Sequence, residues 1–479
     1  MSWNAMDHAG LRRLVLLALT GGVISGYILV GMPGGLMPWT MAFILLVGSG
    51  RLAQQYIPGP ARFGEIVIIA YLLISLIGLI EVGDNLRNFG TVFGKHADDA
   101  LFYQRTMALL RYGEWQERTG LYEAVLALWA VIPTAVFALP MTALDFLPLN
   151  WGFAAVVVGL IGVFCRVTLG ISPPLWILIG GILGNYRFTD SVIHLYREPL
   201  LLLFLLSAMI AITQRRYLRS LFLALPVLLI RGANFLLYGV YLGLTVIRQC
   251  SRSRLMFYGV CVLLGISGLF LTQSVGTTLL KYSSGLTQAG GSVGSEKWSF
   301  AENRTFRSEM IAKQVTDGST TAAVLSGSGP LVTLVRPFPY LFFPIRFWPV
   351  HMADDSHSIF ASTESLQAGA YWINVYVGVT VCCWLFLIPL MSIGLFNAML
   401  GPPVENILFV YYVLAVVLVS FVSCQMRHGL SFIVVNPVLA TIGWRACQGH
   451  ENARRLAWGM GGAVAVALFV YNMLEGSAL

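Results

Sequence analysis

Apolar runs of about 20 residues recur along the whole chain, separated by short polar or charged segments. As a helix, a run of about 20 residues crosses the ~30 Å hydrocarbon core of a bilayer. Of the 479 residues, 57% are apolar and only 11% are charged, whereas a soluble domain carries about 25% charge. A soluble fold cannot hide that much apolar surface. The sequence predicts an all-α, polytopic transmembrane helical bundle of about 11–14 membrane helices, some short or re-entrant.

The net charge of +8 comes largely from arginine clusters between the apolar runs, where the positive-inside rule assigns them to the cytoplasm. Arg12 and Arg13 precede the first run, so the N-terminus is predicted to be cytoplasmic. The chain is predicted to form a single integral membrane domain, 1–479, with extracytoplasmic loops at 83–121 and 272–369. Topology thus explains the charge, and no nucleic-acid partner is expected. The seven cysteines have no C-x-x-C or Cys/His spacing, which argues against zinc sites and disulfides.

One region does not fit simple alternation across the membrane. Three apolar runs lie between Glu123 and Tyr186, and the predicted orientation requires an even number of crossings there. One of the three runs is therefore predicted to be re-entrant or to lie in the membrane interface.

The first loop contains two adjacent carboxylates, Asp98 and Asp99, followed by Tyr103 and a helical pattern that ends near Gly113. Carboxylates at the start of a helix cap it and suit its dipole, which is a purely structural explanation. The functional alternatives are a general base that takes a proton from an acceptor hydroxyl, or a ligand for a divalent cation. The residues alone leave these alternatives open.

A second polar group precedes the apolar run that begins at Pro199, and it contains His194, Tyr196, Arg197 and Glu198. Interfacial snorkelling or an Arg–Glu pair would explain it structurally. A functional explanation is equally open, because the arginine fork binds phosphate oxygens and can stabilise a leaving diphosphate.

Arg231 lies in the middle of the apolar segment Leu221–Ile247. An arginine at the bilayer centre costs about 2.5–3.5 kcal/mol, so it seldom faces lipid. Either one span places Arg231 in a water-filled cavity, or two helices of about 12–14 residues meet at Arg231. We favour the second arrangement, because it keeps the arginine clusters on both sides of this segment in the cytoplasm. Both arrangements predict that Arg231 borders an internal aqueous space.

Two more polar features are predicted to face outward. Arg427 and His428 occupy a short loop between two spans, on the side where positive charge is disfavoured. Arg336 begins an aromatic and proline-rich stretch, 336–351, which is expected to lie along the membrane interface. Two carboxylates and several arginines are thereby predicted to converge on one membrane face, which would suit a lipid-linked phosphate substrate.

The order of these features along the chain resembles that in bacterial GT-C-type membrane glycosyltransferases and the related surface-polysaccharide polymerases. The resemblance spans most of the chain, but each motif is short. The Asp-bearing loop follows the third predicted span, whereas many members have it after the first. The matching motifs are Asp98-Asp99-Ala-Leu-Phe-Tyr103, Arg197-Glu-Pro199, Arg-Pro-Phe-Pro at 336–339, and Arg427-His-Gly-Leu with Pro437 beyond it.

The resemblance implies transfer or polymerisation of sugar units from a polyprenyl-phosphate-linked donor to a glycan or lipid-linked acceptor, at the outer face of the bacterial cytoplasmic membrane. Asp98 or Asp99 would be the base and the arginines would hold the lipid phosphate. No cofactor is implied apart from the divalent cation considered above. A lipid-linked glycan ligase and a flippase or transporter with an arginine-lined path are the alternatives.

Overall fold

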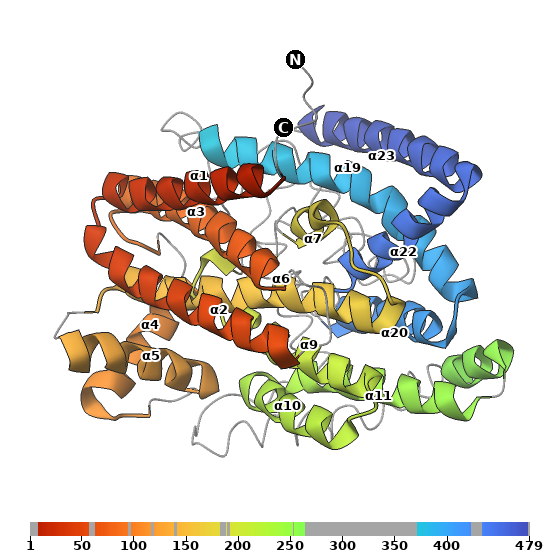
Figure 1. Cartoon of the computed structure of the whole chain (residues 1–479), viewed down its shortest axis with the longest axis horizontal. Coiled ribbons are helices and arrows are strands. Elements are labelled where there is room, and N and C mark those ends of the chain that lie inside the picture. The colour runs from red at the N-terminus through yellow and green to blue at the C-terminus, as the bar shows by residue number, and fades with distance from the viewer. Residues whose placement is uncertain are drawn as a thin grey trace.

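A computed structural model of the chain describes residues 8–56, 63–93, 97–115, 119–137, 141–182, 188, 192–251, 253–263, 371–422 and 434–477. All regular structure in these ranges is helical, and none of the described residues forms a strand. The helices are bundled with many of their axes side by side (Figure 1). The predicted all-α class is confirmed for this part of the chain. The predicted loop 272–369 lies outside it, as do Arg336, Arg427 and His428.

The N-terminal part of the bundle runs from α1 to α7. Its elements are α1 (His8–Leu29), η2 (Pro33–Gly35), α2 (Leu36–Tyr56), α3 (Phe63–Phe89), α4 (Ala97–Tyr112), α5 (Leu121–Phe137), η3 (Ala143–Phe146), α6 (Leu147–Leu169) and α7 (Leu175–Ile182). The remaining elements are α9 (Glu198–Thr213), α10 (Tyr217–Ile230), α11 (Gly232–Cys250), α19 (Tyr371–Leu400), α20 (Pro403–Val422), α22 (Asn436–Gly449) and α23 (Glu451–Ser477).

The core is organised around α6, which packs against α2, α3 and α9 (Figure 1). Its sequence carries no charge before Arg166, and most of its residues are buried. A helix that is apolar on all sides is stable only when it is surrounded by other helices. Trp151 on α6 is fully buried, and Gly78 on α3 gives its indole room, because a Cβ at that glycine would collide with the ring.

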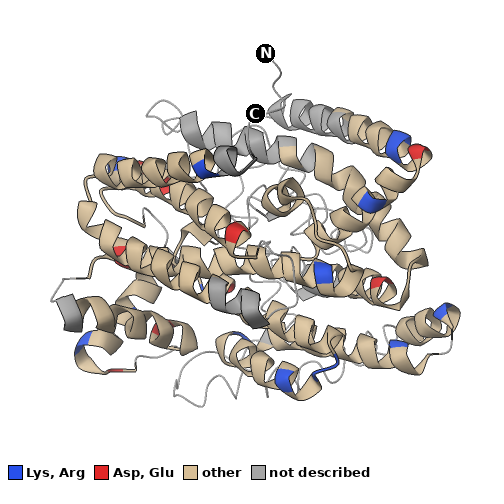
Figure 2. Ribbon diagram, viewed as in Figure 1, with Lys and Arg blue, Asp and Glu red and all other residues tan. Residues whose placement is uncertain are grey.

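Two of the described helical segments are long and apolar enough to cross a membrane, namely Phe63–Arg87 with 25 residues and Ala143–Leu169 with 27. At 1.5 Å per residue they measure about 38 and 40 Å. Charged residues lie mainly at helix ends and connections, and the ribbons between them are largely uncharged (Figure 2).

The helix break predicted at Arg231 is confirmed. Its backbone is extended, with φ −161° and ψ 98°, between the end of α10 and the start of α11. The Ser220 hydroxyl donates to the Tyr238 hydroxyl at 3.0 Å, so the two helices form a hairpin. The 14 residues of α10 match the predicted length, whereas α11 has 19 residues and is longer than predicted. At 1.5 Å per residue, α11 measures about 28 Å.

Two other sequence-based expectations are refined by the helix boundaries. The segment 83–121, predicted as a loop, contains the last turns of α3 and the whole of α4. Of the three apolar runs between Glu123 and Tyr186, the first forms α5 with 17 residues and the second forms α6 with 23, whereas the described part of the third forms α7 with eight. The eight residues of α7 measure about 12 Å, and the residues directly after it, 183–187, lie outside the described part of the chain.

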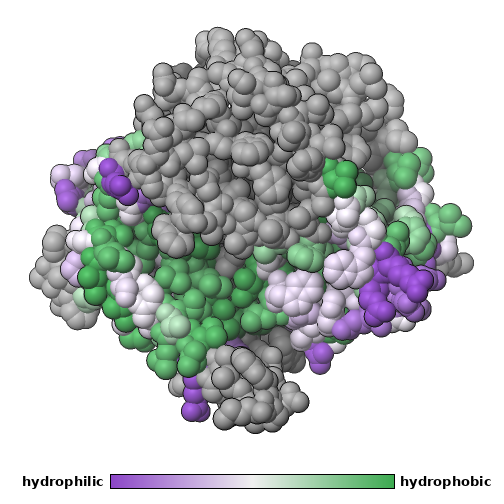
Figure 3. Space-filling model, turned by 90° about the horizontal axis from the view of Figure 1, so that it is seen from above, coloured by the Kyte–Doolittle hydropathy of each residue, from purple (hydrophilic) through white to green (hydrophobic). Residues whose placement is uncertain are grey.

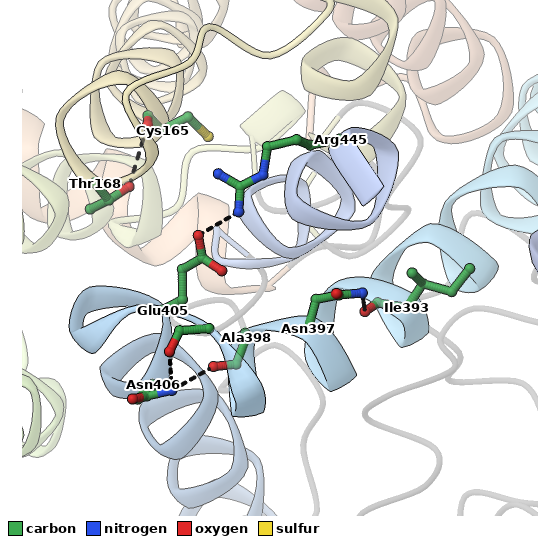
Figure 4. A network of polar contacts seen from close by, with 9 residues as sticks. Cys165, Thr168, Ile393, Asn397, Ala398, Glu405, Asn406 and Arg445 are labelled. Carbon is green, nitrogen blue, oxygen red and sulfur yellow. Dashed lines mark hydrogen bonds and ion pairs between the residues drawn. The ribbon is translucent and has the colours of Figure 1, made fainter. Parts of the chain in front are cut away.

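A polar network links the C-terminal helices (Figure 4). Glu405 on α20 pairs with Arg445 on α22 at 2.5 Å. Next to it, the Asn406 amide donates to the carbonyl oxygens of Ala398 and Met399, at 2.9 and 3.0 Å. The last carbonyls of a helix have no partner within it, so Asn406 closes the end of α19. Arg445 belongs to an arginine cluster that the positive-inside rule assigns to the cytoplasm. The structure shows that it also links two helices.

Replacing Gly443 with alanine is expected to destabilise this region. Helices α19 and α22 cross so closely at Gly394 and Gly443 that a Cβ at Gly443 would overlap the carbonyl oxygen of Leu390. Overpacking of this kind costs about 1–3 kcal/mol, more than the helix propensity that alanine gains. The melting temperature of the detergent-solubilised protein should fall. Gly462→Ala on α23, where a Cβ meets no atom within 4 Å, is the matched control and should not lower it. An unchanged melting temperature in Gly443→Ala would contradict the close crossing.

Candidate functional site

A buried carboxylate–imidazole pair joins two of the polar groups predicted from the sequence. Asp99 lies in the first turn of α4, and its Oδ2 is 2.9 Å from Nδ1 of His194, which precedes α9. Their side chains are 0% and 3% exposed. A carboxylate that only capped a helix would not need a partner so distant in the sequence, so capping alone does not account for Asp99. Asp98 is also on α4, but its side chain is outside the described part of the structure.

The segment that carries His194 is held against α6 by hydrogen bonds from buried side chains. The Asn150 amide donates to the carbonyl oxygens of His194 and Val192, at 2.6 and 3.3 Å. The Trp151 indole donates to the Ile193 carbonyl at 3.4 Å. These bonds give a segment outside the described helices a fixed position in the core, as a buried backbone requires.

An Arg–Glu pair lies next along the chain. Glu198, in the first turn of α9, accepts from Nη1 of Arg231 at 3.2 Å. The two side chains are 11% and 21% exposed. The extended backbone at Arg231 separates α10 from α11, and this break keeps the arginine at the end of two helices instead of inside one. The structural alternative of an Arg–Glu pair is therefore correct for Glu198, although its partner is Arg231 and not the adjacent Arg197.

Arg197 connects this pair to α4. Its Nη1 donates to the Ile230 carbonyl at 3.3 Å, immediately before Arg231, and its guanidinium carbon lies 6.0 Å from the centre of the Phe102 ring. Phe102 follows Asp99 on α4 by one turn. The structure therefore brings together Asp99, Arg197, Glu198 and Arg231, which belong to three of the polar groups recognised in the sequence.

Tyr103 faces an aromatic cluster. Its ring lies 5.9 Å from that of Phe93 and 5.7 Å from that of Phe146. Burial raises the pKa of its hydroxyl, an effect that Arg111 opposes and Asp145 reinforces. These contacts give Tyr103 a packing role on α4.

Positive and negative groups are balanced around the site. Tyr122 on α5 lies within electrostatic reach of three carboxylates, those of Asp99, Glu198 and Glu123. Its hydroxyl is 3.3 Å from the Asn150 side-chain oxygen, and Glu123 also pairs with Arg105 at 3.7 Å. Charges this well buried interact more strongly than they do in water. The site thus combines groups that exchange protons with guanidinium groups that bind anions.

Sequence reasoning did not identify Asn150 or Tyr122 as part of the site, and it did not pair His194 with Asp99. For Asn150 a signal exists, because it is the single amide side chain in the apolar run that forms α6. Among the described residues, no group of three or more His, Cys, Asp or Glu side chains is arranged to hold a metal ion. The divalent cation stays a prediction.

No protein-family model, curated protein or solved structure matches the chain.

Proposed function

We propose that this protein is a polytopic membrane enzyme that transfers or polymerises sugar units from a polyprenyl-(di)phosphate-linked donor. The acceptor is a glycan or a lipid-linked glycan, and the reaction takes place at the outer face of the bacterial cytoplasmic membrane. The observation that carries the proposal is a buried proton-exchanging pair, Asp99 and His194, next to two arginines. Arg197 approaches Phe102, one turn after Asp99 on α4, and it also bonds to the carbonyl immediately before Arg231.

The chemistry of glycosyl transfer requires both halves of this cluster. A base must take the proton from the acceptor hydroxyl, and the Asp99–His194 pair can supply it. Positive groups must neutralise the phosphate as the glycosidic bond to it breaks, and guanidinium groups suit phosphate oxygens. Burial strengthens both effects because water does not screen them.

The exposed apolar surface supports a membrane location with more spans than the two long helices alone. Leu17 on α1, Leu29 at its end and Leu128 on α5 are 73%, 86% and 70% exposed. Apolar residues cover much of the described part of one face, with hydrophilic residues toward its edges (Figure 3). Soluble monomers rarely expose contiguous apolar patches larger than a few hundred Å². A polytopic, GT-C-like bundle with a cytoplasmic N-terminus accounts for this surface.

Binding of undecaprenyl diphosphate to the purified protein tests the phosphate half of the proposal. Arg197→Gln is expected to weaken binding about 10- to 100-fold, because a hydrogen bond to a charged group contributes about 1.5–3 kcal/mol. Native mass spectrometry of the protein in lipid nanodiscs gives the affinity. Arg219→Gln, an exposed arginine on α10, is the matched control and should bind like the wild type. Equal affinity in Arg197→Gln would count against a phosphate site at this cluster.

A transporter is the second candidate, and one observation favours it. Ionisable pairs buried within a membrane bundle occur in proton relays of pumps and transporters, and Asp99–His194 is such a pair. Proteoliposomes distinguish the two functions. An enzyme changes the covalent structure of the lipid-linked glycan, whereas a transporter moves it across the bilayer unchanged. A ligase shares the site chemistry of the proposed transferase and differs from it in the acceptor.

A further inference from the structure

Within the proposed function, on which this inference rests, we infer that His194 is the catalytic base and that Asp99 is its positioning residue. The resemblance to membrane glycosyltransferases gives the role of base to Asp98 or Asp99. The geometry of the pair points instead to the imidazole.

The contact between the two side chains determines which nitrogen can accept a proton. Nδ1 of His194 is the atom that faces Asp99 Oδ2, at 2.9 Å. A carboxylate at that distance favours the tautomer with hydrogen on Nδ1, and this tautomer carries its lone pair on Nε2. Nε2 is then the proton acceptor, and the Asp99 carboxylate stabilises the imidazolium that forms.

The relative basicity of the two groups also favours His194. In model peptides an imidazole titrates near pH 6.5 and an aspartate near pH 3.9, so the imidazole is the better proton acceptor at neutral pH. Both side chains are buried, and the Asp99 carboxylate faces the imidazole at Nδ1, which suits a residue that orients the base.

His194 is held rigidly enough for this role. The Asn150 amide fixes its carbonyl oxygen at 2.6 Å, and its ring lies 5.6 Å from that of Tyr196. A catalytic group held by packing and by hydrogen bonds from rigid elements keeps the geometry that proton transfer requires. Asn150 is on α6, most of whose residues are buried.

The acceptor hydroxyl oxygen forms a bond to the anomeric carbon of the donor sugar, while the bond from that carbon to the phosphate oxygen breaks. The electron pair of the broken bond stays on the leaving phosphate. Arg197 and Arg231 neutralise the negative charge of that phosphate. The hydroxyl proton moves to Nε2 of His194 and passes to solvent after the product leaves.

The pH dependence of the rate is set by the groups around His194. Asp99 faces it from α4, and α6 contributes the uncharged Asn150. Tyr122 on α5 donates to Asn150, and Glu198, paired with Arg231, follows on the same segment. The base works only when it is deprotonated. The wild-type rate should therefore fall as the pH is lowered and the imidazole takes up a proton.

Membrane vesicles that contain the endogenous lipid-linked donor test the inference. His194→Gln is expected to lower the rate of glycan formation by about 10²–10⁴-fold, and its residual rate should lack the fall toward low pH. The exposed His450 at the end of α22 offers the matched control, and His450→Gln should keep both the rate and the pH profile. A wild-type rate and pH profile in His194→Gln, with Asp99→Asn inactive, would overturn the inference and leave the proposed function standing. If wild-type vesicles form no more glycan than vesicles without the protein, the proposed function fails and the inference with it.

Nitrogen NMR of the wild-type protein labelled at its histidines gives a second test, which reads the tautomer of His194 in the native pair. The resonances of His194 are identified by their absence from the spectrum of His194→Gln, or of His194→Asn if that variant folds better. Hydrogen on Nδ1 at neutral pH is expected. Hydrogen on Nε2 alone would overturn the assignment of His194 as the base.

Discussion

Asp99→Asn is expected to lower glycan formation by about 10²–10⁴-fold while the amount of folded protein stays unchanged. Asparagine has nearly the same volume and offers an amide oxygen in place of the carboxylate oxygen that lies 2.9 Å from Nδ1 of His194, so the buried pair keeps its packing. It carries no negative charge, however, and cannot stabilise an imidazolium. The quantity to measure is glycan product per amount of protein in membranes.

Asp98→Asn is the matched control for this prediction, since it removes the neighbouring carboxylate on the same helical turn. We expect a smaller loss, because the contact with His194 is made by Asp99. Full activity in both variants would exclude this turn of α4 from the chemistry.

Arg231→Gln is expected to have the largest effect on stability. Glu198 would lose its cation while its side chain is only 11% exposed, and removal of one partner of a buried pair costs about 3–5 kcal/mol. The melting temperature of the purified protein should fall clearly, and binding of undecaprenyl diphosphate should weaken as well.

A second substitution separates these two effects. In the double variant Arg231→Gln with Glu198→Gln no buried charge is left alone, so stability should largely return, whereas binding of the diphosphate should not. Recovery of both stability and diphosphate binding would mean that Arg231 neutralises Glu198 and does not bind the phosphate. A melting temperature unchanged in the single variant would contradict the buried pair.

The features that could be predicted from the sequence are those whose free energy depends on a residue and its neighbours along the chain. Arg231 in an apolar segment is expensive wherever the chain folds, and the predicted helix break at that residue is present. The all-α class follows in the same way from the apolar runs, because each run must satisfy its own backbone. The start of α4 at the Asp pair is another local feature, since carboxylates favour the first turn of a helix.

Features that depend on contacts between distant segments could not be predicted. Nothing near Asp99 indicates that His194 is its partner, because the two residues meet only in the folded bundle, where Asn150 holds the segment of His194 against α6. Likewise, Glu198 could have paired with its neighbour Arg197, but the hairpin of α10 and α11 places Arg231 against it. The sequence identified the polar groups, and the packing of uncharged helices decided how they combine.

Extraction of the surface glycan from cells with and without the gene is the most direct test of the proposed function. If the protein polymerises lipid-linked units, loss of the gene should remove long chains and leave single repeat units on the lipid carrier. A missing sugar within each unit would instead identify a single-sugar transferase, which the proposal also includes. Wild-type chain length and composition in the absence of the gene, with no lipid-linked precursor accumulating, would contradict it.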